Sequence, residues 1–351
     1  MPRLNVSSPW RGLPWVMLFL LGGCSSVSYY GQLATGQLEL LHARRPVAQV
    51  IADPATDAGL RDRLKHAQLA RRFASTHLHL PDNDSYRLYV DLGRPYVVWN
   101  VFATGEFSLE PVTHCFPIAG CVAYRGYYSQ GAARGEAAVQ RLAGQDVYVS
   151  GVEAYSTLGW FDDPILSSML HWGDERLATL IFHELAHQRV YVKDDTAFNE
   201  SFASFVEQEG TRQWRKARGL APRSLSQSAQ RDQFTALVLQ TRERLQTLYR
   251  QPLSSAEMRL RKAAEFERLR REYRQLRDEK WAGDKRFDRW IDSPMNNARL
   301  LPFGLYDQWV PAFEALYRQA GGDWQMFYAR VQALGGKPAD VRQAALRQLM
   351  P

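Results

Sequence analysis

The spacing of hydrophobic and polar residues changes along the chain and divides it into two kinds of structure. Residues 29–77 carry apolar positions at helical spacing. Residues 85–155 alternate apolar and polar positions, in runs rich in β-branched and aromatic residues that indicate strands of a small sheet. Helical spacing then returns and continues to the end. The pattern predicts an α+β fold, with a sheet-bearing lobe over residues 24–173 and a helical lobe over residues 174–351.

The N-terminal residues have a pattern of their own. Their apolar run, Leu13 to Leu21, is shorter than the roughly 20 residues that span a bilayer, and it is typical of a secretory signal. The run ends in Leu-Gly-Gly-Cys, which resembles a bacterial lipobox. This resemblance implies a lipoprotein signal peptide over residues 1–23 and a lipid anchor on Cys24. An ordinary signal-peptidase site after the same small residues is the alternative.

The lipobox resemblance also implies where the protein is located. Ser25 follows the cysteine, as in lipoproteins that are sorted to the outer membrane. We therefore expect residues 24–351 to form a domain of the cell envelope that faces the periplasm and is held at the membrane by Cys24.

Composition and charge exclude one class of partner. The chain has 45% hydrophobic and 23% charged residues, as globular proteins do, and a formal net charge of +7. Most of the excess arginine lies in residues 212–289, where it is interleaved with glutamate. Interleaved charges predict a solvated, salt-bridged helix surface, so we expect no nucleic-acid binding. Attraction to an anionic membrane surface is the alternative.

Two cysteines remain after Cys24. Cys115 and Cys121 lie six residues apart in the strand-rich region. In an oxidising compartment such a pair can close a short loop, and we predict a disulfide between them. Two buried free thiols are the alternative.

One helical segment carries the pattern His183-Glu184-Leu185-Ala186-His187. Because the two histidines are four residues apart, one helix turn points both imidazoles the same way, at a separation suited to one tetrahedral ion. Glu184 can reach a water near that ion without being a ligand. An ordinary packed or surface pair of histidines is the alternative.

A second helical segment supplies further carboxylates. Glu200, in Asn-Glu-Ser, is the best available third ligand and would leave a fourth position open, as a catalytic zinc ion requires. Glu207 lies on the same helix face and could orient a ligating imidazole, although an exposed glutamate would satisfy the pattern equally well. We expect one Zn²⁺ per chain, held by His183, His187 and Glu200.

These two segments resemble those of a known group of enzymes. HELAHQ followed by NESFASF is similar to the HELAHQ and NEGFASY motifs of the gluzincin aminopeptidases, with a shorter spacer. The segments CVAYRGYY, AYSTLGWFDDP, FNESFA and MNNARL extend the resemblance over most of the chain, to the bacterial family described as predicted zinc-dependent aminopeptidases. The resemblance implies a zincin-like fold, a peptide substrate and Glu184 as the general base.

Two more residues take their expected roles from gluzincins. A tyrosine commonly stabilises the oxyanion, and Tyr306 is the first choice here, with Tyr155 as the alternative. Glu153, in Ser-Gly-Val-Glu-Ala, stands where those aminopeptidases carry a glutamate that binds the substrate's α-ammonium group. Purely structural roles are the alternatives: a packed aromatic for the tyrosines and a solvent-facing strand residue for Glu153.

The motif leaves three functions open. A zinc aminopeptidase is the first, and a zinc endopeptidase is the second. The third is a non-catalytic lipoprotein that binds a component of the envelope. Glu184 argues against the third, because a scaffold needs only the metal ligands.

The lipobox assignment can be tested directly. The protein in the envelope should carry lipid on Cys24 and sediment with membranes, because several acyl chains on one terminus hold firmly. Cys24→Ser should be unprocessed or released from the membrane fraction. Mass spectrometry of the mature N-terminus is the measurement, and an unmodified N-terminus at another residue would contradict the assignment.

Overall fold

The computed structural model describes residues 13–116, 120–154, 156–171, 173–221 and 225–350. The chain divides into two compact units, Met1–Arg44 and Arg45–Pro351. Helix α1 (Leu13–His42) belongs to the first unit. Within the described residues, no helix combines the length and apolar character that a membrane crossing requires. The start of the predicted signal peptide, residues 1–12, and the side chain of Cys24 lie outside the described part.

The second unit contains all the strands and the remaining helices. Its strands are β1 (Arg45–Pro46), β2 (Leu88–Val90), β3 (Val98–Thr104), β4 (His114–Phe116), β5 (Gly120–Val122), β6 (Arg125–Tyr127), β7 (Asp146–Val152) and β8 (Ile165–Leu166). Its helices are α2 (Val47–Ala52), α3 (Ala58–Thr76), α4 (Gln130–Leu142), α5 (Asp174–Arg189), α6 (Thr196–Ala217), α7 (Leu225–Tyr249), α8 (Ser255–Lys280), α9 (Asp288–Ile291), α10 (Asn297–Tyr306), α11 (Val310–Gln319), α12 (Trp324–Gly335) and α13 (Ala339–Leu349). Residues 45–351 form one compact unit, which contains the predicted helical lobe and residues 45–173 of the predicted sheet-bearing lobe, whereas residues 24–44 belong to the first unit.

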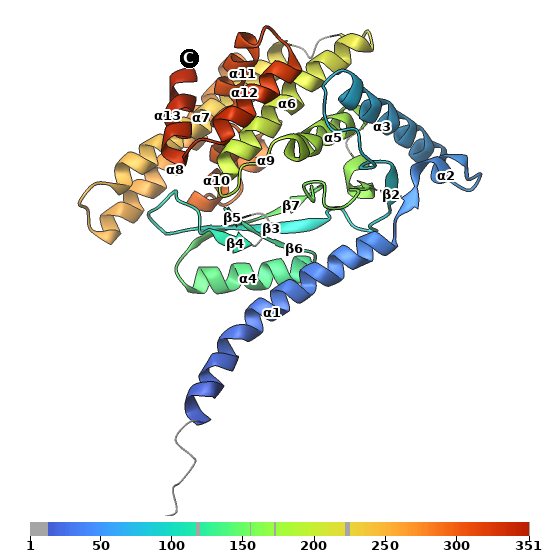
Figure 1. Ribbon diagram of the computed structural model, residues 1–351. Helices are drawn as coiled ribbons and strands as arrows, with labels where there is room; N and C mark the ends of the chain where they lie inside the picture. The colour runs from blue at the N-terminus through green and yellow to red at the C-terminus, as the bar shows by residue number, and fades with distance from the viewer. Residues whose placement is uncertain (1–12, 117–119, 155, 172, 222–224, 351) are drawn as a thin grey trace, which may run out of the picture. The chain divides into compact units, whose positions relative to one another are not determined.

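The strands form three small sheets where the sequence pattern predicted one. Their orders are β1-β2-β8, β6-β3-β7 and β4-β5. In the second sheet β3 is central and antiparallel to both neighbours, and Asn100 pairs with Gly126 on one side and Ser150 on the other. Almost every residue of β3 is buried. The reason is that α4 covers one face of this sheet and the helical part of the unit covers the other (Figure 1).

Helix α4 was not predicted, and its composition explains why. Its two buried residues, Ala133 and Ala137, are small, whereas its larger apolar residues Val139 and Leu142 are exposed. The buried face of this helix therefore consists of small residues, and no large apolar side chain marks it in the sequence. Ser129 marks its start, since the side chain accepts a hydrogen bond from the Ala132 N–H.

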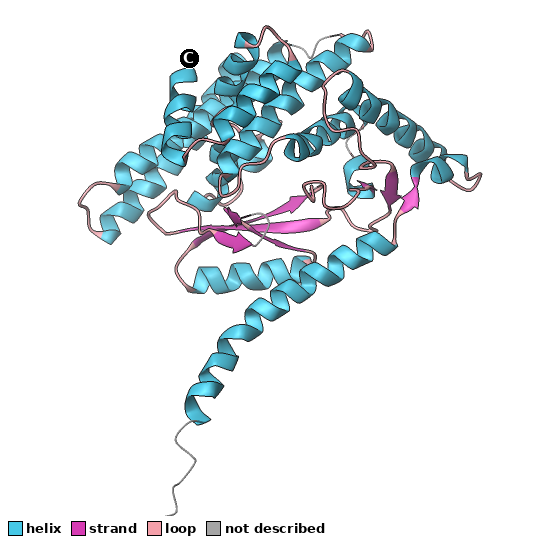
Figure 2. Cartoon of the chain, in the orientation of Figure 1, coloured by secondary structure: helices cyan, strands magenta, loops and turns pink. Residues whose placement is uncertain are grey.

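Helices α5 and α6 pack closely and form the centre of the helical region (Figures 1 and 2). Gly210 of α6 permits this approach, because an added Cβ would lie 3.2 Å from the Phe182 ring and 2.8 Å from Leu78 Cδ1. On its other side α6 buries Phe202 and Phe205 against rings of α11 and α12. Both helices of the predicted motif are thus fixed by core packing.

Asn297 fixes helix α10 against the sheet. Its buried amide nitrogen donates to the carbonyl oxygens of Glu106 and Ser108, both at 3.0 Å, and its Oδ1 accepts from the Tyr249 hydroxyl at 2.7 Å. The backbone N–H of Asn297 donates to Asp146 Oδ2 at 2.8 Å. One asparagine therefore joins α10 to α7 and to the loop that follows β3.

Replacing Asn297 with alanine should lower the free energy of unfolding by about 3 kcal/mol, because several buried partners lose their hydrogen bonds. Denaturant titration of the purified domain measures this loss. Ser293→Ala is the control, since that exposed hydroxyl donates only to a neighbouring carbonyl, and it should change stability by less than about 0.5 kcal/mol. Equal stability of the two variants would contradict the anchoring role.

Candidate functional site

Helix α5 places the two motif histidines in a buried position. The helix begins after Gly173, whose φ of 89° suits glycine, and carries Asp174 and Glu175 in its first turn, where acidic side chains favour the helix dipole. One turn apart, His183 and His187 bring their Nε2 atoms to 3.2 Å from each other, with the rings at 81°. Two imidazole nitrogens at this distance converge on one point.

Helix α6 brings Glu200 to the same point. The helix starts at Thr196, where the Asp195 side chain caps it by accepting from the Phe198 N–H. Glu200 Oε2 lies 3.4 Å from His183 Nε2 and 3.6 Å from His187 Nε2. These are ion-pair distances without hydrogen-bond geometry, and Oε2 is a buried oxygen with no hydrogen-bond partner among the described residues. The three ligand atoms lie within 4.8 Å of one another, a grouping that can hold a metal ion.

Glu207 orients one of the histidines. Its Oε2 lies 3.0 Å from His183 Nδ1, so the Nδ1–H can donate to the carboxylate. When the ring is neutral, this hydrogen bond leaves the lone pair of Nε2 directed toward His187 and Glu200, as a ligating imidazole requires. Arg176 lies beyond Glu207, with Nη1 3.5 Å from Glu207 Oε1.

The buried charges are out of balance unless a cation is present. Glu184, Glu200 and Glu207 are all buried beside two imidazoles, and Arg176 approaches only Glu207 of the three, at 3.5 Å. Burial opposes protonation of His183, but Glu200 and Glu207 outweigh it and raise the pKa of His183 to about 10. Burial raises the pKa of Glu200, whereas the histidines lower it by more, to about 2. Two imidazole nitrogens and a carboxylate are the donor set of a zinc-type site, and a cation there would supply the missing charge.

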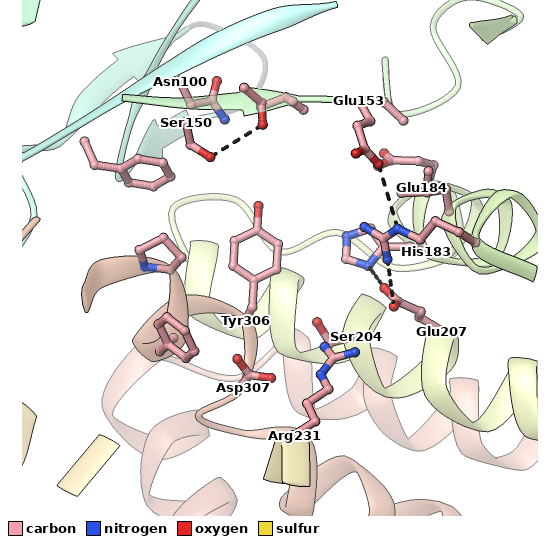
Figure 3. Close-up of a pocket in the computed structure, with 18 residues that line it drawn as sticks. Asn100, Ser150, Glu153, His183, Glu184, Ser204, Glu207, Arg231, Tyr306 and Asp307 are labelled. Atoms are coloured by element: carbon pink, nitrogen blue, oxygen red, sulfur yellow. Dashed lines mark hydrogen bonds and ion pairs between the residues drawn. The ribbon is translucent and has the colours of Figure 1, made fainter. Parts of the chain in front are cut away.

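A cavity of about 400 Å³ is lined by His183, by Glu207 and by three more of the predicted residues. Figure 3 shows Glu184, Glu153 and Tyr306 around this space, contributed by α5, by the end of β7 and by α10. Burial raises the pKa of Glu184 above its usual value. The Tyr306 ring stacks 6.2 Å from that of His183, and burial, together with Glu200, raises the pKa of its hydroxyl well above the usual range. The hydroxyl therefore stays protonated and can donate a hydrogen bond.

Glu153 lies in this cavity beside a positive charge. Its Oε2 is 3.8 Å from Arg176 Nε, and Arg176 also lies near Glu207. Arg176, Arg231 and Asp307 line the same cavity. No sequence motif marks these three residues, because they come from separate helices or helix ends.

A polar network supports the end of α5. Gln188 follows His187 and donates to Asp163 Oδ2 and to Ser85 Oγ, both at 3.2 Å, while its own oxygen accepts from Asn83 at 2.7 Å. Asp163 is buried, and desolvation raises its pKa to about 6 although hydrogen bonds oppose the shift. No pattern around Asp163 in the sequence indicates this contact with α5, because Asp163 and Gln188 lie far apart in the chain.

The other predicted residues lie elsewhere. A disulfide joins Cys115 to Cys121 across the β4-β5 hairpin. The Cys121 N–H donates to Asp194 Oδ1 at 2.6 Å, which ties the hairpin to the loop between α5 and α6. Tyr155, the alternative to Tyr306, lies outside the described residues.

Comparison with known proteins gives one match. Residues 28–346 match the model of the family described as "Putative aminopeptidase". No curated protein and no solved structure matches the chain.

Proposed function

The chain belongs to this aminopeptidase family, and we propose that it is a zinc-dependent peptidase of zincin-like fold whose zinc ion is held by His183, His187 and Glu200. Family membership supports a peptidase. The zinc assignment rests on one observation, the approach of Glu200 Oε2 to both Nε2 atoms at 3.4 and 3.6 Å in a buried site. The helices α5 and α6, which line one cavity together with β3 and β7, support the fold proposal (Figure 3).

Each residue around the cavity has a separate role in the proposed hydrolysis of a peptide bond. When bound, a zinc ion polarises the substrate carbonyl and lowers the pKa of a water. Glu184 accepts a proton from the attacking water and passes it to the leaving amine, a task suited to a carboxylate whose pKa is raised by burial. Tyr306 donates a hydrogen bond to the negatively charged oxygen that forms from the substrate carbonyl when the water attacks. An intact Glu184 in the cavity argues against a purely non-catalytic lipoprotein.

Glu153 gives the aminopeptidase its specificity in this proposal. Its carboxylate faces the cavity that contains Glu184 and is placed to bind the α-ammonium group of a peptide (Figure 3). Arg176 competes for the same carboxylate at 3.8 Å. This contact favours the second candidate, an endopeptidase, because a neutralised Glu153 would not select a free N-terminus.

The proposal includes a location in the cell. A lipid on Cys24 would hold the domain of residues 24–351 at the outer membrane, facing the periplasm, where peptides are the substrate class expected. The disulfide between Cys115 and Cys121 suits such an oxidising compartment.

Metal analysis combined with two kinds of variant tests the centre. The purified domain should contain about one zinc ion per chain, and His187→Ala or Glu200→Ala should lose it, because a three-ligand site cannot spare a ligand. Glu184→Gln should keep the zinc yet hydrolyse peptides at least about a hundredfold more slowly, as loss of a general base predicts. Full metal retention in both ligand variants, or unchanged turnover in Glu184→Gln, would refute the corresponding role.

Blocked and unblocked peptides separate the two candidate activities. For an aminopeptidase, the wild type should cleave free N-termini and spare N-acetylated ones. Glu153→Ala should then lower kcat/KM for free peptides by roughly a hundredfold, because a desolvated carboxylate no longer pairs with the ammonium group. Glu153→Gln is the matched control for charge, since it keeps the size of the side chain. Equal cleavage of free and acetylated peptides by the wild type would establish the endopeptidase instead.

A further inference from the structure

Asn100 places a side-chain amide in the part of the cavity wall that the sheet forms. It lies in the middle of the central strand β3, between buried Trp99 and Val101, although asparagine is disfavoured in strands. The residue is 7% exposed and lines the cavity that contains His183 and Glu184. Among the described residues, the side-chain amide of Asn100 has no hydrogen-bond partner, although its backbone is paired on both sides.

The neighbouring strands leave room for this amide. Gly126 is its partner on β6, and a Cβ there would lie 3.3 Å from Asn100 Oδ1. Ser150 is its partner on β7 and also lines the cavity, but the Ser150 hydroxyl already donates to the Gly151 carbonyl at 3.4 Å. Of the three paired residues Gly126, Asn100 and Ser150, Asn100 is therefore the one whose side chain can form new hydrogen bonds with a molecule in the cavity.

An amide that lines a cavity and has no protein partner is available to a molecule in that cavity, so its position needs an explanation. Asn100 carries no charge and offers both a donor and an acceptor on one planar group. A peptide bond has the complementary pair, an N–H and a C=O. A charged side chain of a substrate would find better partners at Glu153 or Arg176, which line another part of the same cavity.

We propose that Asn100 binds a backbone amide of the substrate on the leaving-group side of the scissile bond. The position follows from the strand geometry. Ser150, beside Asn100, lies in β7, and Glu153 lies in the bend just after the strand ends at Val152, so three residues that span at most roughly 10 Å separate them. An extended peptide whose N-terminus lies at Glu153 covers the same length with about three residues. Figure 3 shows Glu153 and Asn100 at separate places along this wall, with Tyr306 facing the space between them.

This inference rests on the proposed peptidase function and narrows its substrate class. Peptides of three or more residues reach Asn100, whereas amino-acyl anilides and naphthylamides end before it. The enzyme should therefore favour short peptides over such chromogenic amides, and Asn100 should account for part of that preference as a positioning residue.

Binding measurements on the zinc-loaded Glu184→Gln protein test the proposal without turnover. The two ligands are an unblocked tetra-alanine and its analogue with an ester in place of the amide before the third residue, which lacks one N–H. Titration calorimetry should find the ester bound about fivefold more weakly, the typical effect of one hydrogen bond. Adding Asn100→Ala should weaken the amide by a similar factor and remove the difference between the ligands.

Two further variants complete the test. Ser150→Ala is the matched control, and it should keep the fivefold difference between amide and ester because its hydroxyl is already engaged. Asn100→Val guards against a folding defect, because a β-branched residue suits the strand, and it should behave as Asn100→Ala does. A fivefold difference that persists in both Asn100 variants would overturn the proposal while leaving the peptidase function intact. Failure of the Glu184→Gln protein to bind either ligand would overturn both.

Discussion

The buried contact between His183 and the two glutamates of α6 is the constraint on which the rest of the site depends. Glu207 holds Nδ1 of His183 at 3.0 Å, and Glu200 faces Nε2 of the same ring. Both carboxylates are desolvated, which is unfavourable unless positive charge lies beside them. Without a cation, protons on the imidazoles must supply that charge, and the raised pKa of His183 expresses this demand. A metal ion would displace those protons and balance the same carboxylates, so folding and metal binding should be coupled in this protein.

The architecture serves to keep that contact in place. Gly210 allows α6 to approach α5 closely, and Asp195 fixes where α6 begins, so the distance from His183 to Glu200 is set by backbone packing. Helix α10 is held separately by the buried amide of Asn297, and it brings Tyr306 beside His183. The sheet completes the enclosure through β3 and β7. Catalytic groups on packed helices and strands keep their geometry better than groups on loops do.

The sequence predicted those parts of the site that are encoded locally. His183, Glu184 and His187 lie within one turn and a half of helix, and Glu200 lies in the next helix. Their spacing in the sequence is therefore sufficient to predict them as a candidate metal site. Asp163 and Asn100 approach the same region through contacts over long sequence separations, and neither sits in a pattern with chemical meaning. The described strands form three sheets, whereas the sequence pattern predicted one. Several strands have only two or three residues, and their alternation is too short to show which strands pair with each other.

Charge around the cavity bears on the choice between the two peptidase candidates. Glu153, Glu184, Glu207 and Asp307 line it, against two arginines, so acidic groups are in excess. Burial raises the pKa of Asp307 to about 6, so this residue adds negative charge only above that pH. Arg176 is shared between Glu153 and Glu207, at 3.8 and 3.5 Å, and cannot fully neutralise both. Glu153 therefore keeps part of its attraction for a substrate ammonium group. In the proposed peptidase, this negative charge near His183 would favour a substrate with a free N-terminus over a blocked one.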